Sequence, residues 1–312
     1  MTRDHFDGRK FFNPSGPALQ PFTALPRLLL TRRTPWPRTV PVTQREPPDR
    51  HGNDIVVTFI GHATFLIQTQ TATIITDPVF ADHAGPFGLL GPRRVGRPGI
   101  AFERLPPVSL ILLSHNHYDH CDTYALRKLA QRFDPGVVAP LGNASLLRSV
   151  GLGRVEELDW WNEASVAGVP VTLTPAHHFS ARTPFDRNRA LWGGFVITIG
   201  ARRIYFAGDT GYTAAFKDIY ERFGSVDLAL LPIGAYEPRW FMQSIHMNPA
   251  EAVQAHLDLR AHTSVAMHFG TFQLTPEGID EPVHALADAL DSHGIAPNAF
   301  RALSVGESIT VR

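Results

Sequence analysis

A dense group of histidines directly behind an apolar run restricts the possible folds of this chain more than any other feature. Residues 112–122 read LLSHNHYDHCD, in which three histidines and one aspartate lie within six positions. The apolar residues 108–113 predict a buried strand, and Asp122 predicts the N-cap of the helix that follows. The histidines therefore lie on a loop at the carboxyl end of a strand, where α/β sheets usually carry their chemistry.

The overall composition favours a globular protein and excludes several classes. The chain has 312 residues, of which 44% are apolar, enough to bury a substantial core. Its 29 basic and 29 acidic side chains balance without a basic stripe, which argues against a nucleic-acid partner. The single cysteine, Cys121, permits no intrachain disulfide and suits a reducing compartment. With neither a secretory signal nor an apolar run of about twenty residues, we expect a cytoplasmic protein, soluble or peripherally associated with a membrane.

The first part of the chain differs from the rest. Residues 1–53 are rich in proline and arginine, which prevents long helices and strands and predicts an arm that wraps the domain or reaches outward. One interpretation is a packed or disordered extension. The other is a membrane-surface element, because arginines flank leucines and a tryptophan between Phe22 and Trp36. Residues 54–312 are predicted to form the domain proper.

The pattern changes to strands at Asp54. The runs DIVVTFIG, ATFLIQT and ATIITDP are short, β-branched and separated by turn residues, so they predict an antiparallel meander. Beyond the histidine loop, strands are expected at GVVAP, VPVTLTPAH, GGFVITIG, RRIYFAGD, VDLALLPIG, TSVAMHFG and ESITVR. Helices are expected to begin near Asp122, Asn143, Thr213, Pro249 and Glu281. About ten strands and five helices in two halves predict an α/β sandwich of two mixed sheets, face to face, with helices outside.

Chemical elimination leaves metal binding as the role of the histidine group. The chain contains no G-x-S-x-G elbow of a serine hydrolase, no G-x-x-x-x-G-K phosphate loop and no cysteine-rich zinc motif. In the extended stretch H-x-H, alternate side chains point the same way, so His115 and His117 can share one metal. Asp119 and His120 follow where the chain turns into the helix, and can reach a second metal nearby.

Other strand ends supply further candidate ligands. TPAHHF offers His177 or His178, FAGDTGY offers Asp209 and AMHFGTF offers His268, each behind an apolar run. A single histidine or aspartate in such a place is usually a cap or a satisfied polar group. Four strand ends that all carry such residues favour a metal site instead. Parity along the strand does not choose between His177 and His178.

Five segments resemble the metallo-β-lactamase fold hydrolases: GHATFLI, TDPVF, SHNHYDH, FAGDTGY and HFGTF. Within that superfamily, ELDWW, LWGGF, PIGAYEPRWFM and HFGTFQL are similar to the phospholipases D that hydrolyse N-acyl-phosphatidylethanolamine. The similarity runs from around Gly61 to the C-terminus. It implies a four-layer αββα sandwich, two zinc ions per chain, and phosphodiester hydrolysis that yields phosphatidic acid and an N-acylethanolamine. A zinc-dependent lactonase or another small-molecule hydrolase of the same fold is the alternative.

The resemblance also implies which residues hold the two zinc ions. They are His115, His117 and a histidine of TPAHHF for one ion, Asp119, His120 and His268 for the other, and Asp209 between the two. In the family an aromatic residue directly follows the ligand of the TPAHHF segment. That selects His178, which is followed here by Phe179.

Several side chains around these ligands have two interpretations. Asp77 either orients a ligand histidine or begins the turn before Pro78, and His62 is either a donor behind the ligands or a strand-end cap. Tyr118 either donates a hydrogen bond to a phosphoryl oxygen or packs against its neighbours. By family position His246 would face the substrate, so Tyr118, His246 and the bridging aspartate are the expected catalytic residues.

The segment YEPRWFM contains an apolar cluster that core packing alone does not explain. Trp240, Phe241 and Met242 are expected to form a face for acyl chains. Ile245 stands where the family has glutamine, so the family's headgroup preference cannot be carried over to this chain. A phospholipid substrate and a peripheral membrane surface are the expected partners; the sequence leaves the oligomeric state open, with a homodimer as one alternative.

Overall fold

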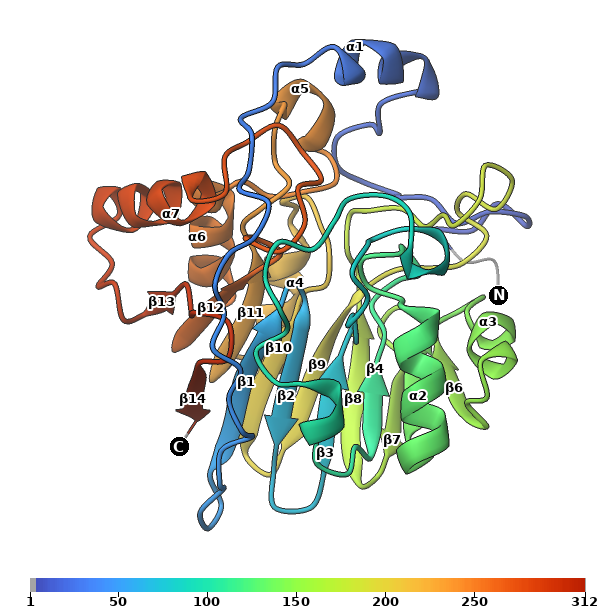
Figure 1. Ribbon diagram of the computed structural model, residues 1–312, viewed down its shortest axis with the longest axis vertical. Coiled ribbons are helices and arrows are strands. Elements are labelled where there is room, and N and C mark those ends of the chain that lie inside the picture. The colour runs from blue at the N-terminus through green and yellow to red at the C-terminus, as the bar shows by residue number, and fades with distance from the viewer. Residues whose placement is uncertain (1–3, 312) are drawn as a thin grey trace.

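Two seven-stranded sheets packed face to face form the centre of the molecule in the computed structural model, which describes residues 4–311 (Figure 1). The side chains of Phe22, Leu25 and Leu29 lie outside that description. The strand order is β14-β1-β2-β3-β4-β5-β6 in the first sheet and β13-β12-β11-β10-β9-β8-β7 in the second. The two orders mirror each other, so each half of the chain builds one sheet, except that the C-terminal β14 returns to the first.

Each sheet joins an antiparallel part to a parallel part. The first contains β1 (Ile55–Gly61), β2 (Thr64–Gln68), β3 (Thr73–Thr76), β4 (Leu110–Leu112), β5 (Gly136–Pro140), β6 (Arg154–Leu158) and β14 (Ser308–Val311). The second contains β7 (Glu163–Val166), β8 (Val169–Thr174), β9 (Gly194–Ile199), β10 (Arg202–Phe206), β11 (Leu228–Pro232), β12 (Thr263–Met267) and β13 (Phe300–Arg301). Pairing is antiparallel from β14 to β3 and from β7 to β10, and parallel in the remainder of each sheet. The predicted meander and the mixed sheets are confirmed.

Helices cover the outer faces of the two sheets. The first sheet carries α2 (Thr123–Phe133) and α3 (Ala144–Ser149), and the second carries α4 (Ala215–Phe223), α6 (Pro249–Asp258) and α7 (Glu281–Ser292) (Figure 1). These are the five helices expected from the sequence. Shorter turns are η1 (Phe22–Ala24), α1 (Leu25–Leu29), η2 (Pro86–Gly88), η3 (Phe102–Arg104) and α5 (Arg239–Met242). The predicted αββα sandwich is confirmed.

The core lies between the sheets. Phe59 and Phe65 of the first sheet, with ring centroids 5.2 Å apart, belong to the same buried cluster as Phe195 and Phe206 of the second. Burial of each such side chain contributes about 1.5–3 kcal/mol. A separate cluster under α2 includes Leu126 and fixes that helix on the first sheet. The apolar strand runs therefore position the loops at their ends rigidly.

The helix behind the histidine loop begins as the sequence predicts. Asp122 is its N-cap, and its carboxylate accepts hydrogen bonds from the backbone N–H groups of Tyr124 and Ala125. The other carboxylate oxygen accepts from the N–H groups of Phe80 and Ala81, which belong to the loop after β3. One aspartate thus joins the loop that carries the histidine motif to the loop after β3, which carries Asp77.

Three strands and two short helices were not expected from the sequence. In β6 and β7 the segments RVEEL and EASV alternate between exposed and half-buried positions, and both strands lie at sheet edges. Edge strands commonly carry charged residues that prevent pairing with other chains. Because of these charged residues, a search for apolar runs does not predict such strands. β13 spans two residues, and α1 and α5 are each about one turn long.

The arm contacts the domain along much of its length. His5 is hydrogen-bonded to Asp159 at 2.8 Å, and the side-chain N–H of Asn13 donates to the carbonyl oxygen of His178 at 2.9 Å. Further along, the indole N–H of Trp36 donates to the carbonyl oxygen of Glu277 at 2.8 Å. The arm then runs beside the sheets to β1 (Figure 1). Within residues 4–311, no helix has the length and apolar character needed to cross a membrane.

Candidate metal centre

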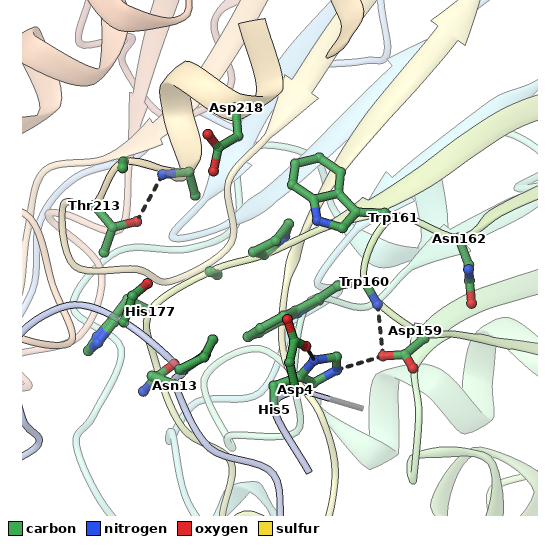
Figure 2. Close-up of a pocket in the computed structure, with 16 residues that line it drawn as sticks. Asp4, His5, Asn13, Asp159, Trp160, Trp161, Asn162, His177, Thr213 and Asp218 are labelled. Atoms are coloured by element: carbon green, nitrogen blue, oxygen red, sulfur yellow. Dashed lines mark hydrogen bonds and ion pairs between the residues drawn. The ribbon is translucent and has the colours of Figure 1, made fainter. Parts of the chain in front are cut away.

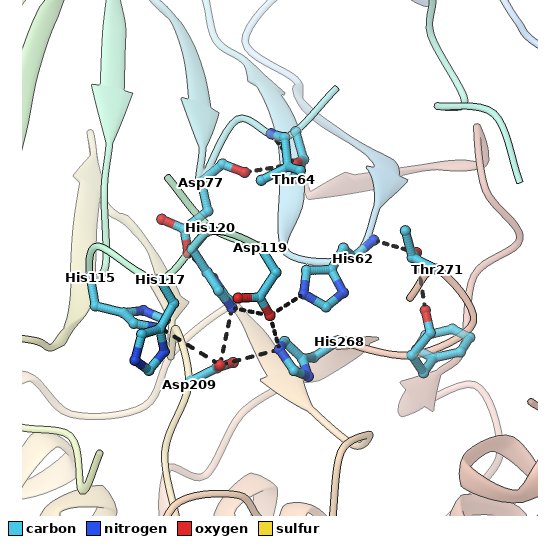
Figure 3. Close-up of polar contacts among 12 residues, drawn as sticks. His62, Thr64, Asp77, His115, His117, Asp119, His120, Asp209, His268 and Thr271 are labelled. Atoms are coloured by element: carbon cyan, nitrogen blue, oxygen red, sulfur yellow. Dashed lines mark hydrogen bonds and ion pairs between the residues drawn. The ribbon is translucent and has the colours of Figure 1, made fainter. Parts of the chain in front are cut away.

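Loops from both sheets meet at one end of the sandwich and carry a group of polar side chains, most of which are labelled in Figure 3. They follow β1, β3 and β4 in the first sheet and β8, β10 and β12 in the second, and the residues are His62, Asp77, 115–120, His178, Asp209 and His268. Within each sheet these three strands run in the same direction. Their carboxyl ends therefore share one edge, and the seam between the sheets brings the two sets together.

Asp209 lies at the centre of this group. Its Oδ2 atom is 3.0 Å from Nε2 of His120 and 3.1 Å from Nε2 of His268. The same oxygen is 3.8 Å from Nε2 of both His115 and His178. Its other carboxylate oxygen is buried and makes no hydrogen bond to a described residue. Four imidazoles around one buried carboxylate oxygen exceed what hydrogen bonding alone can satisfy.

Hydrogen bonds behind two of these rings fix which nitrogen carries the proton. Nδ1 of His178 faces the carbonyl oxygen of Ile245 at 3.0 Å, so Nδ1 donates and Nε2 presents a lone pair. Ser114 donates its only hydroxyl proton to Asp77 at 2.6 Å. Nδ1 of His115 must therefore donate to the serine oxygen, 2.9 Å away, and Nε2 of His115 also presents a lone pair.

These two lone pairs converge with a third histidine. Nδ1 of His117 lies 2.9 Å from Nε2 of His115 and 3.3 Å from Nε2 of His178. At most one proton can lie among the three nitrogens, and inward-facing lone pairs at such distances repel each other. A cation removes that repulsion, and three imidazole nitrogens are a typical ligand set for zinc and related metals. The residues therefore fit a metal ion.

A second group lies on the other side of Asp209 and contains the carboxylate of Asp119. Oδ2 of Asp119 is 3.4 Å from Nε2 of His268 and 3.6 Å from Nε2 of His120. Nδ1 of His120 bonds Asp77 at 2.6 Å, which leaves its Nε2 facing the centre. Neither of these two Nε2 atoms has a hydrogen bond of good geometry among the described residues. Two imidazoles and a carboxylate oxygen thus form another ligand set.

The charges of the two groups differ. Burial opposes ionisation of Asp209, but the neighbouring charge of His120 holds the pKa of this carboxyl well below its usual range. Burial also opposes a charge on His120, yet Asp209 and Asp119 raise its pKa well above the ordinary value. Burial lowers the pKa of His117 to about 4. The group that contains Asp119 and Asp209 therefore attracts positive charge, which a metal ion would supply in place of a proton. The group of His115, His117 and His178 stays neutral.

Three residues of the centre have a left-handed backbone. The φ angles of His62, Asp77 and His268 are 58°, 32° and 62°. Such angles cost free energy for residues other than glycine and concentrate at functional sites. They turn the chain sharply at the ends of β1, β3 and β12, and so direct these side chains toward the seam.

Comparison with protein families matches residues 72–269 to the β-lactamase superfamily domain. The chain belongs to the metallo-β-lactamase superfamily. The matched range contains every residue of the two ligand groups, and the chain is a metal-dependent hydrolase of this fold.

Individual relatives agree with this assignment. The chain is 37% identical over 284 residues to N-acyl-phosphatidylethanolamine-hydrolyzing phospholipase D 1 of Caenorhabditis elegans, covering 86% of this chain and 80% of that protein. It is 36% identical over 236 residues to the mitochondrial phospholipase D of the same description from Saccharomyces cerevisiae, and spans 73% of this chain and 50% of the yeast protein. The solved structure of Igni18, a metallo hydrolase from Ignicoccus hospitalis, has a TM-score of 0.62 at 23% identity, covering 83% of this chain and 99% of that one, and shares the fold.

Within this metallo-β-lactamase centre, the two adjacent histidines after β8 point in different directions. His178 turns toward His115 and His117 and forms the three-histidine group with them. Nδ1 of His177 instead bonds the carbonyl oxygen of Ser244 at 2.5 Å, and its ring lies against Gly16 of the arm. The structure therefore places His178, and not His177, beside His115 and His117, and its role as a ligand stays a prediction.

Other expected residues lie at varying distances from the ligands. His246 is buried, and its ring centroid is 5.1 Å from those of both His178 and His268. The hydroxyl of Tyr118 donates to the carbonyl oxygen of Arg182 at 2.9 Å. His62 donates from Nε2 to Asp119 at 3.0 Å, behind the second group.

The aromatic and methionine cluster divides into different environments. Met242 is buried against Ile245. Phe241 lines a small apolar cavity of about 140 Å³ with Leu19 and Phe179, and the ring of Phe179 lies 4.5 Å from that of His117. Trp240 stacks beneath the guanidinium of Arg27 at 4.1 Å.

Two residues with a role at the centre were missed by sequence reasoning. Ser114, the residue directly before the histidines, connects Asp77 to His115 and sets the proton position of that ring. Its position directly before His115 in the motif SHNHYDH could have indicated a contact with that ring. Arg187 stacks on Phe179 at 4.5 Å, beside the three-histidine group. It lies in the same loop as His178, between β8 and β9, but too far along that loop for a short-range pattern to link the two residues.

A large cavity lies outside the ligand groups. It has a volume of about 860 Å³ and is lined by the arm, the loop after β6 and the start of α4 (Figure 2). It includes His177 but no residue of the two ligand groups. The chemistry is therefore assigned to the histidine and aspartate centre, and the large cavity is a separate feature.

Proposed function

We propose that this chain is a zinc-dependent phosphodiesterase of the phospholipase D type, which hydrolyses N-acyl-phosphatidylethanolamine to phosphatidic acid and an N-acylethanolamine. The observation that carries the proposal is the pair of ligand groups on either side of Asp209, within a chain whose nematode and yeast relatives bear that activity in their names.

Two ions fit this arrangement better than one. The first would be held by His115, His117 and His178, and the second by Asp119, His120 and His268, with Asp209 shared. Zinc suits this set because nitrogen and oxygen atoms dominate it and the only cysteine, Cys121, is not part of it. When bound, such ions supply Lewis acidity to phosphoryl oxygens and lower the pKa of a coordinated water.

The residues of the chain would position the phosphodiester. His246 is buried beside both ligand groups, and its Nδ1 has no hydrogen-bond partner among the described residues, so it can donate to a phosphoryl oxygen. The hydroxyl of Tyr118 could act likewise once it leaves the carbonyl oxygen of Arg182. The guanidinium of Arg187, half-buried next to His117, adds positive charge where an anionic substrate would approach.

Apolar surfaces near the centre support a lipid substrate. The cavity between Leu19, Phe179 and Phe241 would take part of an acyl chain. Leu30 and Phe185 are 86% and 83% exposed, and arginines are near each of them in the sequence. Exposed apolar side chains with flanking arginines suit an anionic membrane surface, so we propose that the protein associates peripherally with membranes.

The test is a product analysis with purified, zinc-loaded protein. N-acyl-phosphatidylethanolamine in vesicles should yield phosphatidic acid and N-acylethanolamine in equal amounts, measured by mass spectrometry. Asp209→Asn should abolish both products, whereas Asp288→Asn, the same change on the exposed face of α7, should leave the rate unchanged.

A lactone and a soluble phosphodiester serve as competing substrates. Turnover of the lactone without release of phosphatidic acid would replace the proposal by the lactonase alternative. Hydrolysis of the soluble phosphodiester but not of the lipid would keep the metal chemistry and discard the lipid assignment.

A further inference from the structure

The large cavity beside the metal centre has an unusual combination of walls. Trp160 and Trp161 line it together with the carboxylates of Asp4, Asp159 and Asp218. Among residues 4–311, its lining contains no lysine or arginine. In Figure 2 Asp218 and Trp161 lie on one side of the space and Trp160 with His5 on another, while His177 and Thr213 close a third side. The space is therefore aromatic and acidic.

The tryptophans are held in place by the fold. The indole N–H of Trp160 donates to the carbonyl oxygen of Trp192 at 2.7 Å, and the ring of His5 stacks on that of Trp160 at 4.2 Å. The backbone N–H of Trp161 donates to the carbonyl oxygen of Leu173 at 2.7 Å, although its φ angle is 67°. A bulky residue with such a φ is uncommon and persists only where its surroundings require it. Both rings are thus presented as a preformed wall.

The carboxylates come from three separate parts of the chain. Asp4 belongs to the arm, Asp159 follows β6, and Asp218 lies on the exposed face of α4. His5 joins the first two, with 2.7 Å to Asp4 and 2.8 Å to Asp159. Among the described residues, Arg222 stacks on Trp161 at 4.9 Å and does not line the cavity. The arrangement favours a positively charged occupant.

That occupant is not a bare metal ion. Among residues 4–311, the groups whose ligand atoms lie close enough to hold a metal include none of these three aspartates. A larger cation with carbon atoms around its charge suits the rings better, because indole faces attract ammonium groups and their alkyl substituents. We propose that this cavity binds a small organic ammonium ion of the choline or ethanolamine type.

The cavity has a structural connection to the metal centre. His177 forms part of its wall, and the next residue, His178, belongs to the three-histidine group. His177 also bonds the carbonyl oxygen of Ser244, close to His246 in the sequence. Asn13, another lining residue, donates its side-chain N–H to the carbonyl oxygen of His178, but no side chain of the two ligand groups lines the cavity, so the ammonium site is argued separately from the reaction proposed above.

Calorimetric titration of the metal-loaded protein with choline tests the proposal directly. The matched ligand control is 3,3-dimethylbutan-1-ol, which has the same shape without the charge. Choline should bind saturably, and the neutral analogue should bind about tenfold more weakly, the difference expected when a ring face loses a cation. Equal affinities for the two ligands, or the absence of saturable choline binding, would overturn the proposal.

Variants locate the binding within the cavity. Asp218→Asn preserves the shape of an exposed side chain and should weaken choline binding several-fold, whereas Asp288→Asn on α7 should not change it. Trp161→Leu should weaken binding about tenfold, with circular dichroism as the check on folding. If this variant does not fold, the aspartate pair decides the outcome. Unchanged affinity in Asp218→Asn would place choline elsewhere and contradict the proposal.

The same charge could come from a free amine or from a lipid headgroup. Vesicles of phosphatidylcholine distinguish the two sources when wild type and Asp218→Asn are compared by sedimentation. If less of the variant than of the wild type sediments with the vesicles, the site binds a lipid headgroup. If equal amounts sediment but the variant binds soluble choline more weakly, the site binds a free amine.

Discussion

Asp77→Asn should weaken metal binding without dismantling the fold. The carboxylate of Asp77 is fully buried and accepts hydrogen bonds from Nδ1 of His120 at 2.6 Å and from the N–H and hydroxyl groups of Ser114 at 2.7 and 2.6 Å. These bonds keep a proton on Nδ1 of His120, so that Nε2 faces the centre with a lone pair. An asparagine can present its N–H₂ group to His120, which favours the opposite tautomer and places a proton on Nε2.

The magnitude follows from the role of such partners. Loss of a carboxylate behind a metal-binding histidine typically weakens metal affinity by about 10- to 100-fold, or about 1.4–2.8 kcal/mol. A hydrogen bond to a charged group contributes about 1.5–3 kcal/mol to stability, so the melting temperature should fall as well. Competition with a chromophoric zinc chelator, at a temperature where circular dichroism shows folded protein, measures the affinity separately from stability.

The matched control is Asp122→Asn. Its carboxylate is also buried and accepts backbone hydrogen bonds from α2 and from the loop after β3, but none from a histidine. This variant should lose stability and retain zinc affinity. If Asp77→Asn binds zinc as tightly as Asp122→Asn does, the orientation argument is wrong.

Three further predictions concern single measurements. Because burial raises the pKa of Cys121 to about 12, a thiol reagent at about pH 8 should modify it only upon unfolding, and rapid modification of folded protein would contradict its burial. Burial lowers the pKa of His62 and of His246 to about 3, whereas in the unfolded chain these histidines take up protons below about pH 6.5. The free energy of unfolding of the metal-free protein, measured in urea, should therefore decrease as the pH falls from 6.5 toward 3. A free energy of unfolding that does not change over this range would contradict the burial of the two histidines. His178→Ala should lose most of its bound zinc by elemental analysis while His177→Ala keeps it, and the reverse ranking would exchange their roles.

The sequence predicts the parts of this molecule whose cause is local. Apolar β-branched runs indicate the central strands, and Asp122 indicates the start of α2, because burial and capping act on neighbouring residues. The charged edge strands β6 and β7 lack that signal.

The same distinction between local and distant causes applies to the metal centre. Candidate ligands could be identified because each follows an apolar strand, and the structure brings those seven residues together. The positions of the protons could not be predicted, because they depend on partners far along the chain. His178 takes its orientation from the carbonyl oxygen of Ile245, and His120 takes its orientation from Asp77. The division of the arm from the domain at residue 53 stays a prediction.

The location of the centre at the seam has a mechanical consequence. His115, His117, Asp119 and His120 are carried by the first sheet, whereas His178, Asp209 and His268 are carried by the second. Each ligand group contains residues from both sheets, so every bound ion would cross-link two layers that otherwise adhere through apolar side chains. Sliding or separating the layers would then require breaking coordination bonds at one edge while the opposite edge remained free. A force that separates the two sheets would therefore meet more resistance at the edge that carries the metal centre than at the opposite edge.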